Sequence, residues 1–217
     1  MATETNEDVS SSGFAKILKQ KWHTDLRLKA GDSSDIQAIS AHKLVLAARS
    51  DVFKKMLESE VTKAPSDHET LNISEMRHEE LETLVEFMYN DDGSVSSAKL
   101  KKHDRSFYLA AQRYEIPHLR DLCRNELLSS LSSSNALYVL ELSHVPLDKP
   151  LNDAALSFIA RNIKTFLDSI EFKMFVARNP NLSLEITKAF LNPVMIPFEY
   201  ESDDDEDDDE DDDDDDE

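Results

Sequence analysis

The sequence predicts an α+β protein in which three short strands come early and amphipathic helices follow. Residues 25–30 and 70–73 alternate apolar and polar side chains, which is the period of a strand with one buried face, and residues 36–41 form another β-prone run. From residue 43 onwards, apolar residues recur mainly at the spacing of one helical face. These patterns indicate a small three-stranded sheet flanked by helices.

An amphipathic helix is predicted before the first strand. Residues 1–9 are polar and are expected to be disordered. From Ser11 or Ser12, apolar side chains recur on one helical face and lysines occupy the other. The apolar face needs a cover, which is either the rest of its own domain or a second copy of the chain. Its residues are Phe14, Ile17, Leu18 and Trp22.

Two opposite charges mark the ends of the first two strands. Asp25 opens the first strand, and Lys43 follows the second. Because adjacent strand ends of a small sheet lie close together, we expect these side chains to pair.

Each later helix of the sheet domain has a start signal. Leu44, Ala47 and Ala48 suit one face of the helix that begins near Lys43. A polar loop over residues 58–69 then precedes the third strand. The predicted caps and first-turn residues of the following helices are Ser50 or Asp51, Ser74, Asp104 and Pro117.

A serine-rich segment, residues 129–134, separates this domain from a second, helical unit. Three or four short helices are expected there, because prolines cannot continue a helix interior and recur at short intervals. The predicted breaks lie near Pro146, Pro150, Pro180 and Pro193. We therefore expect an α+β domain at 10–130, an all-α extension at 131–195, and a disordered tail at 196–217.

The formal net charge of −21 is concentrated at one end of the chain. Residues 203–217 are fifteen consecutive acids, so the remainder carries only −6. The tail is self-repelling, and phosphates would repel it, which disfavours nucleic acid as a partner. It either solubilises the protein or contacts basic proteins such as histones or a basic client.

Membrane insertion and secretion are not expected. No apolar run reaches the roughly 18 residues that a span requires, and the N-terminus lacks a signal peptide pattern. The single cysteine, Cys123, lies among leucines and is expected to be a buried thiol. An intracellular protein, nuclear and/or cytoplasmic, is the expectation.

No enzyme chemistry is expected. The three glycines cannot build a phosphate-binding loop or a dinucleotide fingerprint, and no nucleophile motif is present. The seven histidines show no metal-ligand spacing. We therefore predict no cofactor, no metal site and no catalytic residues.

Several motifs together resemble the BTB fold, also called POZ. They are D-L-R-L at 25–28, S-A-H-K-L-V-L-A-A-R-S-D-V-F-K-K-M-L at 40–57, E-F-M-Y-N-D-D-G-S-V at 86–95, A-A-Q-R-Y-E-I-P-H-L at 110–119 and C-R-N-E-L-L at 123–128. N-A-L-Y-V-L-E-L-S-H at 135–144 and A-A-L-S-F-I-A-R-N at 154–162 resemble the helical extension called BACK or three-box. The likeness is strongest to the speckle-type BTB adaptors of cullin-3 ubiquitin ligases.

This resemblance implies roles for particular residues. The first helix would lie in a homodimer interface, and His42 would hold the strand-to-helix turn. Asp25 and Lys43 match the charged pocket of BTB dimers, although a plain ion pair that fixes the strands is the alternative. The cullin-contact triplet, a hydrophobic residue, any residue and glutamate, matches Val61, Thr62 and Lys63, where Lys63 departs from the pattern.

Two functions follow from the resemblance. The leading one is a non-catalytic, substrate-specific adaptor of a cullin-3 RING ubiquitin ligase, which dimerises and brings a client protein to the ligase. The client would bind the helical extension, the tail or a separate subunit. The alternative, favoured by Lys63 and the acidic tail, is a dimerisation scaffold in transcriptional or chromatin complexes that does not bind cullin.

Overall fold

The computed structural model describes residues 13–33, 37–60, 69–90, 93–144 and 146–192. Its sheet consists of β1 (Leu26–Ala30), β2 (Ile39–Ala41) and β3 (Glu69–Ile73), with β1 in the centre. β2 runs antiparallel to β1 and pairs Ala41 with Leu26, whereas β3 runs parallel and pairs Leu71 with Leu28. The predicted three-stranded sheet is confirmed, and the alternation of β1 places Leu26, Leu28 and Ala30 in the core.

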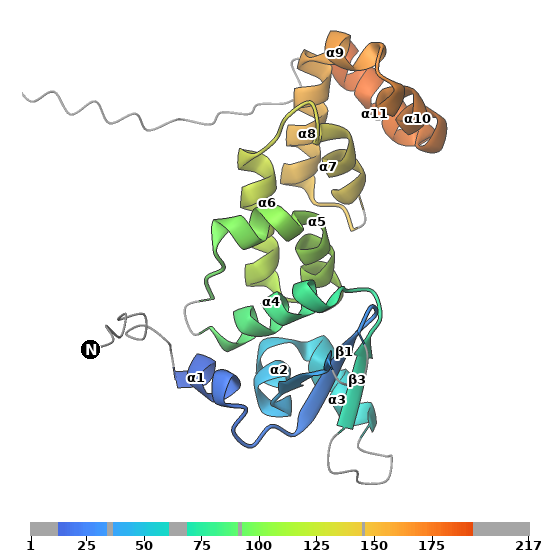
Figure 1. The fold of residues 1–217 in the computed structure, drawn as a ribbon. Helices are drawn as coiled ribbons and strands as arrows, with labels where there is room; N and C mark the ends of the chain where they lie inside the picture. Colours follow the sequence, from blue (N-terminus) through green and yellow to red (C-terminus); the bar gives the residue numbers. More distant parts are fainter. Residues whose placement is uncertain (1–12, 34–36, 61–68, 91–92, 145, 193–217) are drawn as a thin grey trace, which may run out of the picture.

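Three helices lie against this sheet (Figure 1). They are α2 (Lys43–Arg49), α3 (Asp51–Glu60) and α4 (His78–Tyr89). Ser50 caps α3, because its hydroxyl accepts a hydrogen bond from the backbone N–H of Phe53 at 3.1 Å. The ring of Phe53 stacks on that of Tyr114 with centroids 4.5 Å apart, and both side chains are buried. This contact joins α3 to the later helices.

α4 begins later than its predicted cap, Ser74, because other groups satisfy its first N–H donors. The backbone N–H of His78 donates to Asp32 Oδ1 at 2.7 Å, and that of Arg77 donates to Glu80 Oε2 at 2.9 Å. Asp32 follows β1, so the start of α4 is tied directly to the end of the central strand.

α1 (Gly13–Gln20) is the predicted N-terminal helix and packs near α4. It ends two residues before Trp22, which lies in the turn that leads to β1. Lys21 and His23 in this turn have positive φ values of 49° and 51°, so the chain reverses sharply there.

α5 (Ser97–Arg113) and α6 (Pro117–Ser129) form the next layer. α5 starts at a Ser96 cap, eight residues before the predicted cap at Asp104. The backbone leaves helical geometry at His103, and Asp104 follows this kink. The Asp104 carboxylate there accepts a hydrogen bond from the Tyr138 hydroxyl at 2.5 Å. Pro117 occupies the first turn of α6, as predicted.

The remaining described residues form the predicted all-α extension. Its helices stack beyond α5 and α6, at the end of the molecule away from the sheet (Figure 1). Pro150 and Pro180 lie in the first turns of their helices, where a missing N–H is harmless. The helices are α7 (Ala136–Leu142), α8 (Lys149–Arg161), α9 (Ile163–Leu167), α10 (Ile170–Arg178) and α11 (Pro180–Leu191).

Candidate protein-interaction surfaces

The apolar face of α1 and the following turn is incompletely covered. Phe14 is 50% exposed and Trp22 is 60% exposed, whereas Ile17 and Leu18 are half-buried. No residue of α1 is fully buried. Exposed aromatic side chains next to half-buried aliphatic ones are typical of a surface that another protein covers.

Leu44, at the start of α2, is a further exposed apolar residue. Its side chain is 78% exposed, and Leu46 is the residue of α2 that enters the core. The prediction that Leu44, Ala47 and Ala48 share one apolar face therefore holds only for Ala47, which packs against the core, whereas Leu44 and Ala48 are exposed. The seven-residue helix offers too few turns for the periodicity to distinguish the two faces.

His42 connects three segments behind this surface. Its Nε2 atom donates to the carbonyl oxygen of Trp22 at 2.7 Å, and its backbone N–H donates to the Tyr89 hydroxyl at 2.6 Å. Because a carbonyl only accepts, Nε2 carries the hydrogen, and in the neutral ring Nδ1 accepts from the Tyr89 hydroxyl at 2.7 Å. Burial raises the pKa of Tyr89 to about 12, so its hydroxyl keeps its proton at neutral pH. This geometry fits the expected architectural role of His42.

The structure brings Asp25 and Lys43 together, but not as an ion pair between their side chains. Asp25 Oδ1 accepts a hydrogen bond from the backbone N–H of Lys43 at 2.8 Å, which satisfies a donor at the start of α2. The ammonium group of Lys43 forms its ion pair with Glu69. Glu69 begins β3, and the parallel pairing of β3 with β1 places it beside Leu26, next to Asp25. Asp25 was therefore the wrong partner to expect for the Lys43 side chain. Glu69 reaches Lys43 through the pairing of β3 with β1, which joins residues far apart in the sequence.

Part of the Glu69 carboxylate remains buried without a partner among the described residues. Its Oε2 atom contacts Lys43, and its Oε1 atom has no hydrogen bond there. The predicted cullin-contact residues Val61, Thr62 and Lys63, in the segment between α3 and Glu69, lie outside the described residues. The acidic tail also lies outside them.

An ion pair between a partly exposed arginine and a buried carboxylate attaches the helical extension to the sheet domain. Arg124 on α6 places Nε 2.8 Å from Oδ2 and 3.0 Å from Oδ1 of Asp148. The Asp148 side chain is 2% exposed, caps α8 and also accepts a hydrogen bond from the Tyr108 hydroxyl at 2.8 Å. Burial, together with this bond, raises the pKa of Tyr108 to about 12. The sequence did not predict the role of Asp148, because this residue lies between two prolines and resembles a loop residue.

The described residues offer no support for catalysis by Cys123 or a metal. Cys123 is fully buried, and burial raises the pKa of its thiol to about 12, so the reactive thiolate is scarce at neutral pH. Its predicted place in the core is confirmed. In the described ranges, no three His, Cys, Asp or Glu side chains gather as a metal site would require. None of the helices described there is long and apolar enough to cross a bilayer.

Comparison with known proteins identifies relatives of nearly the whole chain. The model of the BTB/POZ domain family matches residues 14–131. One BTB/POZ domain-containing protein of Arabidopsis thaliana is 59% identical over 190 residues, which cover 87% of this chain and 91% of the relative. A second from the same plant is 56% identical over 192 residues, covering 88% and 85%. A third is 62% identical over 156 residues, covering 71% and 94%.

Proposed function

This chain belongs to the BTB/POZ domain family, whose domains generally mediate dimerisation and contacts with protein partners, and we propose that it is a cullin-3 adaptor. In this role the protein dimerises, binds the N-terminal region of cullin-3 and carries a client protein to the ubiquitin ligase. It is not an enzyme, because the transfer of ubiquitin belongs to its partners. The role requires an intracellular location, nuclear and/or cytoplasmic.

The observation that carries the dimerisation step of this proposal is the uncovered apolar face of the N-terminal helix. Phe14, on the helix beside α4, and Trp22, in the turn that follows it, expose about half or more of their surface. A homodimer would bury these rings against a second copy, and it would present two client sites and two ligase contacts. The exposed Leu44 extends the apolar surface available for such an interface.

The attachment of the extension supports binding to a large partner. The sheet domain and a BACK-like extension would together form one cullin-binding surface only if they hold a fixed relative orientation. The Arg124–Asp148 pair and the Tyr138–Asp104 hydrogen bond both span the junction between them. Charge-assisted, partly buried contacts of this kind restrict rotation of the two units.

A pulldown with the cullin-3 N-terminal region tests the proposal. Val61→Asp should abolish binding, because a charge would enter the apolar groove that the triplet is proposed to fill. Thr62→Ser, at the position where any residue is accepted, is the matched control and should bind like the unaltered protein. Lys63→Glu should increase binding, because it restores the glutamate of the pattern. Equal binding by all three variants would contradict the assigned triplet.

The second candidate is a dimerisation scaffold in transcriptional or chromatin complexes. Lys63 and the run of acids at 203–217 favour it, since an anionic tail attracts basic proteins. This candidate predicts no cullin-3 binding by the unaltered protein, while the homodimer is retained. It also predicts that basic proteins such as histones are retained on the full chain at low salt and released at high salt.

A further inference from the structure

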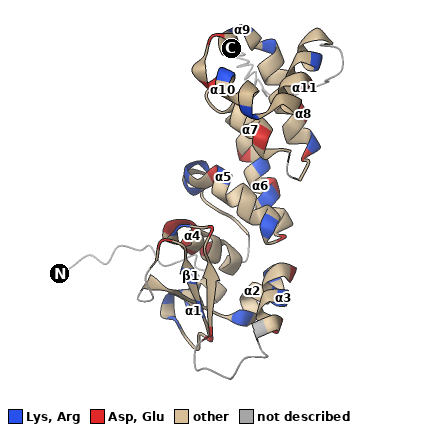
Figure 2. Cartoon of the chain, turned by 90° about the vertical axis from the view of Figure 1, so that its right-hand side faces the viewer, with Lys and Arg blue, Asp and Glu red and all other residues tan. Residues whose placement is uncertain are grey.

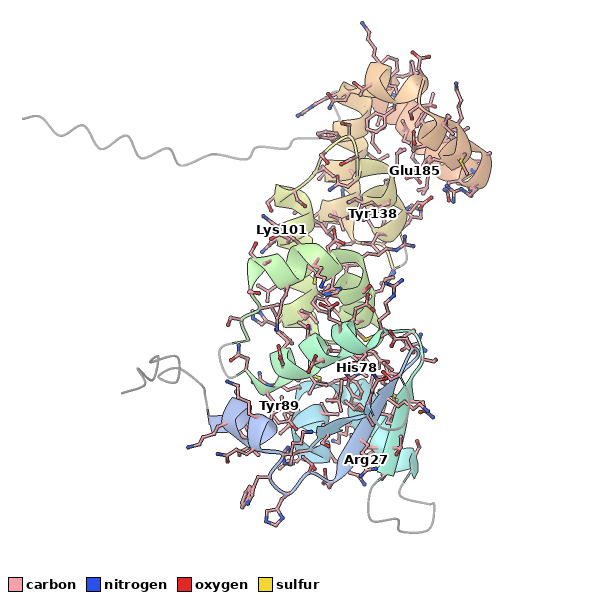
Figure 3. The ribbon with its side chains drawn as sticks, in the orientation of Figure 1. Arg27, His78, Tyr89, Lys101, Tyr138 and Glu185 are labelled. Carbon is pink, nitrogen blue, oxygen red and sulfur yellow. The ribbon has the colours of Figure 1, made fainter. Side chains whose placement is uncertain are left out.

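The helical extension contains an apolar groove that no described segment fills. The groove has a volume of about 640 Å³ and lies between α7, α9 and α10. Phe166 and Phe175 are buried in its floor, whereas Met174 is 53% exposed at its edge. Tyr138, labelled in Figure 3, also lines it. Aromatic and methionine side chains in a concave surface are suited to receive an apolar peptide.

The helices around the groove carry unpaired positive charge. Residues 161–192 hold five basic and three acidic side chains, so this part is net positive in a chain whose total is −21. Within the described part of the chain, none of these five basic residues forms an ion pair. Arg178 lines the groove together with Glu141 and Glu171, so the surplus of positive charge lies on the distal helices and not in the groove itself. Figure 2 shows basic positions on the distal helices. The five residues are Arg161, Lys164, Lys173, Arg178 and Lys188.

The sequence that follows α11 is complementary to this surface in both apolarity and charge. Residues 194–198 read V-M-I-P-F, and fifteen acids follow at 203–217. Pro193 and Pro197 restrict their neighbours to extended backbone, which suits binding in a groove. The six residues 193–198, when extended, reach roughly 20 Å from the end of α11, and the twelve residues of this helix span about 18 Å. The apolar run can therefore return along α11 to the groove.

We propose that residues 194–200 bind in cis in the groove between α7, α9 and α10, and that the acidic run lies along the basic residues of the distal helices. The apolar segment is tethered to α11, so binding is intramolecular and proceeds at an effective concentration on the order of millimolar. Burial of the apolar run supplies the attraction, and the acids neutralise the unpaired cations. The bound segment would compete with any partner that uses the same groove.

Methyl NMR of the full chain labelled with ¹³C-methyl methionine tests the proposal directly. Met195 reports on the segment, Met174 reports on the groove, and the buried Met76 and Met88 of the sheet domain serve as internal controls. A nitroxide on Ser202→Cys should broaden the Met174 methyl signal several-fold without affecting Met76 or Met88. Cys123 is buried and will not take the label in the folded protein. If the Met174 signal stayed as sharp as those of Met76 and Met88, the proposal would be overturned.

Two substitutions on α10 make a matched pair. Met174→Glu places a charge at the edge of the groove and should move the Met195 methyl signal to its position in an unstructured peptide. Val176→Glu lies on the same helix, is 39% exposed and does not line the groove, so it should leave Met195 unchanged. Unchanged Met76 and Met88 signals verify that each variant is folded. If both variants release Met195, or neither does, the groove is not its binding site.

A mixing experiment distinguishes binding in cis from binding by a second copy. Spin-labelled protein with natural-abundance carbon is mixed with unlabelled ¹³C-methionine protein. Broadening of Met174 in the mixture would assign the groove to a partner subunit and overturn the proposal. A sharp Met174 signal in the mixture, together with a broadened one when the spin label and the ¹³C-methionine are on the same chain, supports it. None of these outcomes depends on whether cullin-3 binds.

Discussion

The Nε atom of Arg124, on α6, lies 2.8 Å from Oδ2 of Asp148, the residue immediately before α8. The carboxylate is 2% exposed, and it accepts hydrogen bonds from the guanidinium and from the Tyr108 hydroxyl. A buried charge is stable only when it is paired in this way. The pair therefore fixes the helical extension to the sheet domain.

Removal of one member of the pair should destabilise the protein strongly. Arg124→Met removes the cation that pairs with the Asp148 carboxylate, and because this carboxylate is 2% exposed, we expect a loss of about 3 to 5 kcal/mol in the free energy of unfolding. Urea denaturation followed by circular dichroism measures it. Lys149→Ala, which removes an exposed ion pair to Asp153 on the same helix, is the control and should cost less than about 1 kcal/mol. Similar losses for both variants would contradict the assigned role of the pair.

A pair of double-mutant cycles distinguishes the two carboxylates near Lys43. Glu69 contacts the ammonium group of Lys43, so Glu69→Gln combined with Lys43→Met should show a coupling of roughly 1 to 3 kcal/mol. Asp25 contacts only the backbone N–H of Lys43 in the described hydrogen bonds, so Asp25→Asn combined with Lys43→Met should show a coupling near zero. The couplings are measured by chemical denaturation. A larger coupling for Asp25 than for Glu69 would instead support the Asp25–Lys43 ion pair that the sequence predicts.

Alkaline pH should destabilise the fold. The pKa values of Tyr89, Tyr108 and Cys123 are raised to about 12, from 10.0 for tyrosine and 9.0 for cysteine, mainly by burial. The unfolded chain therefore loses these protons first, and their stabilising contribution is complete below about pH 9 and is lost between pH 9 and pH 12. We expect the free energy of unfolding to fall by roughly 2 to 5 kcal/mol between pH 8 and pH 11.

Denaturation curves at several pH values measure this loss. Cys123→Ala should flatten its onset between pH 9 and pH 10, because the thiol titrates first in the unfolded chain. A stability that stays constant up to pH 11 would be incompatible with the raised pKa values.

Cys123 should react slowly with thiol reagents in the folded protein. Its side chain is fully buried, and burial raises its pKa to about 12, so both access and thiolate concentration are low. We expect the rate of reaction with a disulfide reagent at pH 8 to rise at least about 100-fold on unfolding in guanidinium. Rapid labelling of the native chain would show that the thiol is accessible.

Local patterns predicted the elements whose formation depends on near neighbours. The strand at Leu26–Ala30, the N-terminal helix and the Ser50 cap followed from period and capping rules, and all are present. The contacts that sequence reasoning missed depend on residues far apart in the chain. Glu69 reaches Lys43 only through the parallel pairing of β3, and Asp148 reaches Arg124 only after the extension packs on α6.

Short helices and irregular backbone limited the prediction in other places. Leu44 was assigned to the wrong face because α2 has only seven residues. The start of α5 was misplaced because the helix kinks at His103, and Asp104 has the features of a cap where a helix is already in progress. The charged-pocket and dimer residues followed from family resemblance, and the structure supplies their surroundings: an exposed Trp22 and a buried Glu69 oxygen.

Light scattering of the full chain at micromolar concentration, alone and mixed with the cullin-3 N-terminal region, tests the central claim most directly. We predict a homodimer alone and a complex of two chains with two cullin fragments in the mixture. Trp22→Asp should convert the dimer to a monomer, while Leu167→Asp, at a position 52% exposed on the distant α9, should remain dimeric. A chain that stays monomeric and does not add mass with the cullin fragment would contradict the proposed function.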